Sequence, residues 1–162
     1  MKVGETVLLE GEAQGNLLPS RIPGGKSLWY IATGAGLAPF LSIIKTNHET
    51  HQESREEILV VGARSLKEVE ELKVLAREAS PTCRVYGATT REPSELQGRL
   101  PLLLTEGTLE NFVGTTFNPE DSRVMLCGNP DCMKEARKIF KTRGLVAPRF
   151  GAPGQLLVET LW

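Results

Sequence analysis

The sequence lacks most features that mark membrane, secreted or nucleic-acid-binding proteins. No apolar run approaches the roughly 18 residues that a membrane helix needs, so we expect no contact with a membrane. The first five residues, Met-Lys-Val-Gly-Glu, show neither the apolar segment nor the cleavage site of a secretory signal. A net charge of −1 favours neither nucleic acid nor an anionic surface as a partner. These absences favour a cytoplasmic protein.

Cysteine and histidine are also scarce, with three and two residues respectively. Cys83, Cys127 and Cys132 cannot all pair within the chain, and Cys127 and Cys132 have no histidine nearby in the sequence. His48 and His51 both lie in a polar segment that we expect to be a solvated loop. We therefore predict no metal site.

The chain does contain an alternation of apolar runs and amphipathic segments. We expect strands from about 27 to 33, 57 to 63, 83 to 89, 122 to 127 and 155 to 159. Helices are expected after residue 36, over 66–78, near 99–106 and over 131–142. Ser65 with Glu68 matches a capping box, and Gly144 suits a helix C-cap. This order predicts an α/β fold, with an open, doubly wound, parallel five-stranded sheet and helices on both faces.

Residues 1–26 differ in character from the rest of the chain. Residues 2–10 alternate like a half-exposed strand, and residues 11–25 are rich in glycine, proline and polar side chains. A lone strand and loop cannot bury a core. We therefore expect 1–26 to be the end of a preceding β-barrel domain with its linker, and 27–162 to be the α/β domain.

A glycine turn follows the first predicted strand, at the edge where open parallel sheets bind their ligands. The turn, Thr33-Gly-Ala-Gly36, leads directly into a helix, and such turns expose N–H groups that bind anions such as pyrophosphate. Pro39 occupies the place of the third glycine in the full dinucleotide motif. The turn could therefore also be a simple tight connection.

Arginines follow the next two predicted strands. Arg64 comes directly after the second strand, Arg91 follows the third in Thr90-Arg-Glu92, and Arg99 lies eight residues further on. A guanidinium group can bind a phosphate monoester through two charge-assisted hydrogen bonds. Three arginines at one edge could converge on one anion, and each could equally be a solvated surface charge.

The fourth predicted strand ends in Cys127-Gly-Asn-Pro130, and the chain ends in Glu159-Thr-Leu-Trp162. Cys127 could lie beside a reactive group in the crevice, or be a small buried apolar residue. Glu159 could position a proton or be a surface side chain. Trp162 could be a platform for an aromatic cofactor ring or an apolar plug for the chain end.

Together these motifs resemble the NADP-binding half of bacterial-type ferredoxin (flavodoxin)–NADP reductases, over about residues 2 to 162. The segment from Leu28 to Ser42 is similar to the family's A-T-G-T-G-I-A-P-F-x-S sequence, and Cys127 to Met133 to its C-G-N-P-x-M sequence. Thr90-Arg-Glu92 and Gly98-Arg99 resemble the two segments that hold the 2′-phosphate of NADP.

The resemblance implies an oxidoreductase that exchanges hydride between NADP(H) and FAD, with the flavin passing single electrons to or from ferredoxin or flavodoxin. Cys127 and Glu159 would lie at the site of hydride transfer, and Trp162 would cover the flavin. The other residues implied in cofactor binding are Thr33, Gly34, Ala35, Gly36 and Pro39 at the pyrophosphate, Arg64 beside the adenosine, Thr90, Arg91 and Arg99 at the 2′-phosphate, and Gly128, Asn129, Pro130 and Met133 of the C-G-N-P-x-M segment.

The sequence departs from the family pattern in three places. Ala35 replaces the usual threonine, and Leu161 occupies a position that is often aromatic. The Arg-x-Tyr-Ser flavin motif is missing, and only Gly15-Asn-Leu17 resembles the end of the flavin-binding barrel. We therefore expect this chain to bind FAD weakly or not at all. Two alternatives stay open: a nucleotide-binding module that acts with a separate flavin-binding chain, and an NAD-dependent reductase component of an oxygenase.

Overall fold

The computed structural model describes residues 2, 4–8, 11, 15–50, 55–149 and 152–161. One sheet contains β1 (Ser27–Thr33), β2 (Glu56–Ala63), β3 (Arg84–Thr89), β4 (Ser122–Gly128) and β5 (Leu156–Thr160). Its strands are parallel and lie in the order β3-β2-β1-β4-β5. The order changes direction between β1 and β4, so the loops that follow these two strands border a crevice.

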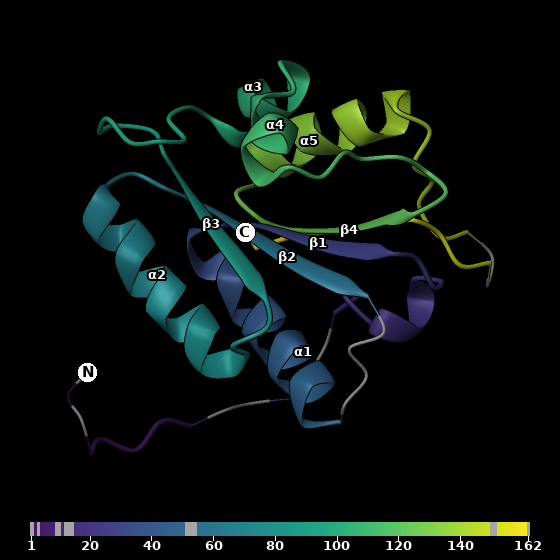
Figure 1. Ribbon diagram of the computed structural model, residues 1–162. Helices are drawn as coiled ribbons and strands as arrows, with labels where there is room; N and C mark the ends of the chain where they lie inside the picture. Colours follow the sequence, from purple (N-terminus) through teal and green to yellow (C-terminus); the bar gives the residue numbers. More distant parts are fainter. Residues whose placement is uncertain are drawn as a thin grey trace.

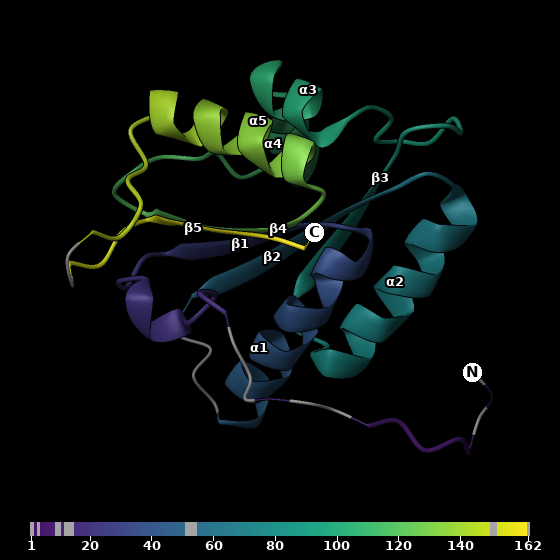
Figure 2. The ribbon, with the colours of Figure 1, turned by 180° about the vertical axis from the view of Figure 1, so that it is seen from behind.

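Helices cover both faces of the sheet (Figures 1 and 2). One face carries α1 (Leu37–Glu49) and α2 (Leu66–Ala79), and the other carries α3 (Leu100–Thr105), α4 (Thr108–Val113) and α5 (Pro130–Thr142). Two single 3-10 turns, η1 (Pro19–Arg21) and η2 (Gly34–Gly36), precede β1 and α1. The predicted doubly wound, five-stranded α/β architecture is confirmed.

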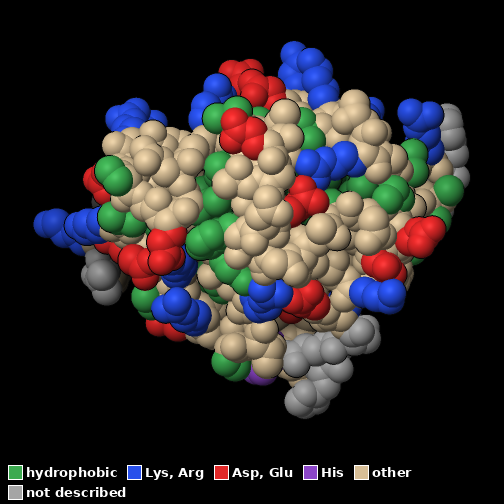
Figure 3. All heavy atoms as spheres, turned by 45° about the horizontal axis from the view of Figure 1, so that its top comes forward, with side chains coloured by type: hydrophobic (Ala, Val, Ile, Leu, Met, Phe, Trp, Pro, Cys, Tyr) green, Lys and Arg blue, Asp and Glu red, His purple; other side chains and the backbone are tan. Residues whose placement is uncertain are grey.

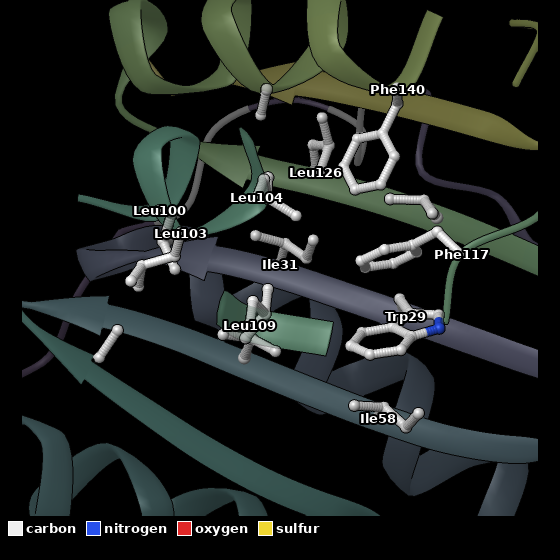
Figure 4. Packing of buried hydrophobic residues seen from close by; sticks show 14 of the residues in the cluster. Trp29, Ile31, Ile58, Leu100, Leu103, Leu104, Leu109, Phe117, Leu126 and Phe140 are labelled. Atoms are coloured by element: carbon white, nitrogen blue, oxygen red, sulfur yellow. The ribbon is translucent and has the colours of Figure 1, made fainter. Parts of the chain in front are cut away.

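The sheet separates two hydrophobic cores. Side chains alternate along β1, so that Leu28 and Tyr30 pack toward α1 and α2 whereas Trp29 packs toward the opposite helices. Trp29 is fully buried, and its ring centroid lies 4.1 Å from that of Phe117, which in turn packs on Phe140 (Figure 4). A strand that is buried on both faces needs apolar residues at successive positions, which explains its continuous apolar run.

Two segments differ from the sequence prediction. α4 was not predicted, because its six residues between Gly107 and Gly114 are too few to show a helical period. The region of His48 was predicted as a solvated loop, but α1 continues to Glu49. The reason lies in Asn47, which is buried and donates a hydrogen bond of 2.7 Å to Glu57 Oε1. His51 lies outside the described residues.

The N-terminal segment forms no strand in its described residues, 2 and 4–8, contrary to the prediction. A strand needs a neighbour, and Figure 1 shows this segment beyond α1 and α2, away from the sheet. Closer to β1, Leu17 and Ile22 are buried in the core on the α1 side. Gly154 N–H also donates to the Arg21 carbonyl at 3.3 Å. The domain division at residue 26 stays a prediction.

The surface carries both signs of charge. On the face drawn in Figure 3, Lys and Arg side chains are interspersed with Asp and Glu side chains. Within the described residues, no helix is long and apolar enough to cross a membrane. The described side chains also contain no group of three or more His, Cys, Asp or Glu residues that could hold a metal ion.

Candidate functional site

A cleft of about 810 Å³ opens at the carboxyl edge of the sheet. Its walls come from the loops after β1, β2, β3 and β4, and from the starts of α2, α3 and α5. The predicted site residues that line it are Thr33, Gly34, Arg64, Thr90, Arg91, Arg99 and Asn129. Segments that are far apart in the sequence thus meet in one cleft, as expected for the crevice of a doubly wound sheet.

The turn after β1 leaves the N-terminus of α1 uncapped. No side chain caps η2 or α1, and the first turn of α1 contains no acidic residue. Thr33 does not serve as a cap because its Oγ1 accepts the Asn129 N–H at 2.8 Å. Uncapped N–H groups and the positive end of a helix favour an anion. This turn therefore offers a place for a negatively charged group.

The ends of β1 and β4 lie very close together behind this turn. A Cβ atom on Gly36 would lie 2.2 Å from the carbonyl oxygen of Cys127. A Cβ atom on Gly128, whose φ is 140°, would lie 2.2 Å from Thr33 Oγ1. Glycine is therefore required at both positions, because backbone from the neighbouring strand occupies the space of a side chain.

Three exposed arginines line the cleft: Arg64 from the loop after β2, and Arg91 and Arg99 from the loop between β3 and α3. Backbone hydrogen bonds join these two loops: Arg91 N–H donates to the Arg64 carbonyl at 3.0 Å, and Thr90 N–H donates to the Ala63 carbonyl at 3.1 Å. Arg99 precedes α3 and lies 3.9 Å from Glu135, an exposed ion pair of small energy. The cleft thus contains three cationic side chains on a backbone that is held together.

Glu68 is a carboxylate in the same cleft. It accepts hydrogen bonds from Arg64 N–H at 2.8 Å and Ser65 N–H at 3.2 Å, and this completes the predicted capping box. These backbone hydrogen bonds, with a smaller effect from the charges of Arg64 and Arg91, lower the pKa of Glu68. Glu68 is therefore ionised at neutral pH and offsets part of the positive charge of the cleft.

Cys127 and Glu159 are neighbours on β4 and β5 but do not line the cleft. Cys127 is fully buried, and burial, together with the charge of Glu159, raises the pKa of its thiol to about 11. The thiol is thus protonated at neutral pH and is not a nucleophile. The Glu159 carboxylate accepts the Asn16 N–H at 2.7 Å, so the segment before β1 holds it in place.

The remaining predicted site residues lie around these features. Ala35 is exposed in η2, and Pro39 is half-buried in the first turn of α1. Pro130 is the first residue of α5, and Met133 is fully buried in the core beneath that helix. Trp162 lies outside the described residues, so its place relative to the site stays a prediction.

Comparison with known proteins points to one family. Residues 30–138 match the family model described as the oxidoreductase NAD-binding domain. A ferredoxin–NADP reductase of Pseudomonas aeruginosa is 32% identical over 171 residues, which cover 98% of this chain and 66% of the relative. A flavodoxin/ferredoxin–NADP reductase of Escherichia coli is 30% identical, over 100% of this chain and 67% of the relative. The chain belongs to the ferredoxin–NADP reductase family.

A solved structure of the family has the same fold. The ferredoxin–NADP⁺ reductase of Neisseria gonorrhoeae, with bound FAD and NADP, is 35% identical and superposes with a TM-score of 0.80. The match covers 92% of this chain and 61% of the Neisseria protein. The resemblance inferred from the motifs is thereby confirmed. This chain spans 60–66% of the length of the first three relatives, so the activity, substrates and partners of the whole enzyme are matters for proposal.

Four residues that line the cleft of this reductase domain from helices were not predicted, because the predicted site rested on motifs in loops. Glu68, Glu71 and Leu72 line the cleft from α2, and Cys132 lines it from the first turn of α5. Helical spacing was the available signal, because Glu71 and Leu72 follow Glu68 by three and four residues and so share its face. Burial raises the pKa of Cys132 to about 11, so this residue presents a neutral thiol to the cleft.

Proposed function

We propose that this chain is the NADP(H)-binding domain of a ferredoxin/flavodoxin–NADP reductase and positions the nicotinamide for hydride exchange with FAD. One observation carries the proposal: Gly34, in the uncapped turn that leads into α1, and three arginines line the same cleft. NADP has two separate anionic groups, a pyrophosphate and a 2′-phosphate, whereas NAD has only the first. The cleft has two corresponding kinds of cationic site.

Each kind of site suits one of these groups. The Gly34 turn with the N-terminus of α1 would bind the pyrophosphate through backbone N–H groups. Arg91 and Arg99 would bind the 2′-phosphate through charge-assisted hydrogen bonds, with Thr90 beside them. Arg64 would border the adenosine from the loop after β2.

The nicotinamide would lie toward Cys127 and Glu159, where β4 and β5 end side by side. Bound FAD would supply the hydride acceptor and the one-electron chemistry of the complete enzyme. The buried and protonated Cys127 would support the nicotinamide site through its shape and would not act as a nucleophile. Glu159, held by the Asn16 N–H, would orient a polar group at the same end of the sheet.

The flavin and the electron-transfer partner belong to the complete enzyme. Ferredoxin and flavodoxin are the partners that the names of the relatives suggest. We propose that FAD binds weakly or not at all to this chain, because the Arg-x-Tyr-Ser flavin motif is missing from its sequence. A cytoplasmic location is part of the same proposal.

The proposal predicts a preference for the 2′-phosphate. By titration calorimetry, 2′-phospho-AMP should bind more tightly than AMP, because only the first places a phosphate among the arginines. Replacement of Arg91 by alanine should weaken binding of 2′-phospho-AMP by about 1.5–3 kcal/mol, the range for a hydrogen bond between charged groups. Arg137→Ala is the matched control, since Arg137 is an exposed arginine of α5 that does not line the cleft.

Two results would contradict the assignment. Equal affinities for AMP and 2′-phospho-AMP would mean that the arginines do not bind the 2′-phosphate. An equal loss of affinity in Arg91→Ala and Arg137→Ala would mean that Arg91 contributes only its charge to the overall field. The same two affinities also test the NAD-dependent alternative, because a domain that uses NAD has no need to distinguish these ligands.

A further inference from the structure

Four backbone N–H groups at the start of α2 already donate to side chains of this chain. Arg64 N–H and Ser65 N–H donate to the Glu68 carboxylate, and Glu68 N–H donates to Ser65 Oγ at 3.3 Å. Leu66 N–H donates to Glu92 Oε2 at 2.8 Å. The hydrogen bond between Leu66 and Glu92 differs from the others because it joins two segments: Glu92 belongs to the loop after β3 and not to α2 itself.

The long helices in the described part of the chain differ at their N-terminal ends. α5 has the Asn129 side chain as its cap and Asp131 in its first turn. α2 has Glu68 and Glu92. α1 has neither a side-chain cap nor an acidic residue in its first turn. The turn before α1 therefore has no side-chain acceptor that competes with an anion, whereas four N–H groups at the start of α2 are occupied, and preference for a 2′-phosphate must come from the arginine side chains.

Glu92 is held at two points. Its carbonyl accepts a hydrogen bond of 2.5 Å from the hydroxyl of Thr89, a fully buried residue, and its carboxylate accepts the Leu66 N–H. Arg91, the preceding residue, donates its N–H to the Arg64 carbonyl. Arg91 lines the cleft, while Glu92 is bound to α2. The loop that presents Arg91 is thus fastened on both sides of this residue.

We propose that Glu92 is a positioning residue: by tying the loop after β3 to the start of α2, it holds Arg91 in the cleft and sets the preference for a 2′-phosphate. This inference rests on the proposed function. A long arginine side chain loses entropy when it is fixed on a ligand, and a backbone that is already fixed reduces that loss. The same hydrogen bond occupies the Leu66 N–H, so this group cannot bind an anion and add affinity that is independent of the 2′-phosphate.

The hydrogen bond can be removed from either side. Glu92→Ala removes the acceptor. Leu66→Pro removes the donor, and proline is well tolerated there because Leu66 is the first residue of α2. Ser65, with φ −127° and ψ 161°, already has the extended conformation that precedes proline. If Glu92→Ala does not fold, Leu66→Pro still tests the role of the hydrogen bond between Leu66 and Glu92.

Two variants serve as matched controls. Glu92→Gln keeps an oxygen that can accept the Leu66 N–H but removes the charge. Glu95→Ala removes an exposed carboxylate from the same loop, three residues further on. The quantity to measure is the ratio of the dissociation constants of AMP and 2′-phospho-AMP by calorimetry, with thermal unfolding to show that each variant is folded.

We expect Glu92→Ala and Leu66→Pro to lower this ratio by about fivefold, part of the loss expected when Arg91 itself is removed. Glu92→Gln and Glu95→Ala should keep the ratio of the unaltered chain. An unchanged ratio in folded Leu66→Pro would overturn the inference, as would a loss in Glu92→Gln equal to that in Glu92→Ala, because charge and not the tie would then be responsible. An unaltered chain without any preference for 2′-phospho-AMP would instead refute the proposed function.

Discussion

Thr33 joins the ends of β1 and β4 and also lines the cleft. Its hydroxyl oxygen accepts the Asn129 N–H at 2.8 Å, and the same atom leaves no space for a side chain on Gly128. A hydroxyl that accepts one hydrogen bond can still donate its own hydrogen. Thr33 lines the cleft, so that hydrogen can be donated to a ligand. One residue thus joins two strand ends and contributes to the site.

The two glycines of the turn should respond differently to alanine. Gly36→Ala places a Cβ atom 2.2 Å from the carbonyl oxygen of Cys127, and backbone cannot move aside easily, so we expect a loss of about 3 kcal/mol or more of unfolding free energy. Gly34→Ala has no atom within 4 Å of the new Cβ, and only its φ of 52° opposes it, at a cost of about 1–2 kcal/mol.

Urea denaturation of both variants measures this difference. Since both changes add the same methyl group to the same turn, each is the control for the other. Equal destabilisation would show that the close approach of β1 and β4 does not restrict Gly36. The expected order would show that Gly36 keeps the two strand ends together and that Gly34 provides the turn.

At the scale of helices and strands, the sequence predicts an element well when the element carries a complete pattern. The strand β2 and the helix α2 were predicted because one has a continuous apolar run and the other a full amphipathic period with a capping box. α4 has too few residues for such a period, and the strand predicted at 2–10 does not form in the described residues of that segment, 2 and 4–8. Local pattern therefore does not predict elements that depend on their surroundings.

The same limit applies to the candidate site. The loops at strand ends could be predicted because glycine and arginine in that position have a direct chemical meaning, as Gly34 and Arg91 show. Helical spacing puts Glu71 on the same face as Glu68, but it does not show that this face meets the cleft, because Glu71 and Cys132 reach the cleft only through the packing of α2 and α5 on the sheet. The tie between Leu66 and Glu92 is beyond sequence reasoning, since it joins residues 26 positions apart.

The capping box of α2 predicts an acid-dependent contribution to stability. Hydrogen bonds from Arg64 N–H and then Ser65 N–H lower the pKa of Glu68 from its ordinary value of 4.5. A carboxylate whose pKa is lower in the folded state stabilises the protein above its unfolded pKa, and this contribution disappears as the pH falls through the folded value. Urea midpoints measured between neutral pH and about pH 3 should therefore fall less steeply for Glu68→Gln than for the unaltered chain.

Glu71→Gln is the control for this experiment. Glu71 lies on the next turn of α2, and its exposed ion pair with Lys67, at 3.9 Å, contributes little to stability. Its acid dependence should match that of the unaltered chain. A Glu68→Gln profile parallel to that of the unaltered chain would show that the capping hydrogen bonds do not favour the ionised carboxylate.

At the scale of the whole molecule, one sheet brings four loops and three helix starts to the same edge. The proposed function assigns this cleft to a nucleotide, and we expect the flavin that would receive the hydride to be held by other residues. The described part of the chain before β1 contributes Leu17 and Ile22 to the core but no strand. The proposed function predicts that this chain binds a nucleotide without binding a flavin.

This separation can be tested on one sample of the purified chain. After incubation with FAD and dialysis, we expect a colourless protein that reduces no acceptor when NADPH is added, yet binds 2′-phospho-AMP in the calorimeter. The binding shows that the same sample is folded, so the missing colour reports on FAD alone. Addition of a separate flavin-binding protein that restores reduction would favour the two-chain alternative. A yellow sample with one flavin per chain would show that this chain binds FAD itself. The proposal that it binds the nucleotide but not the flavin would then be wrong.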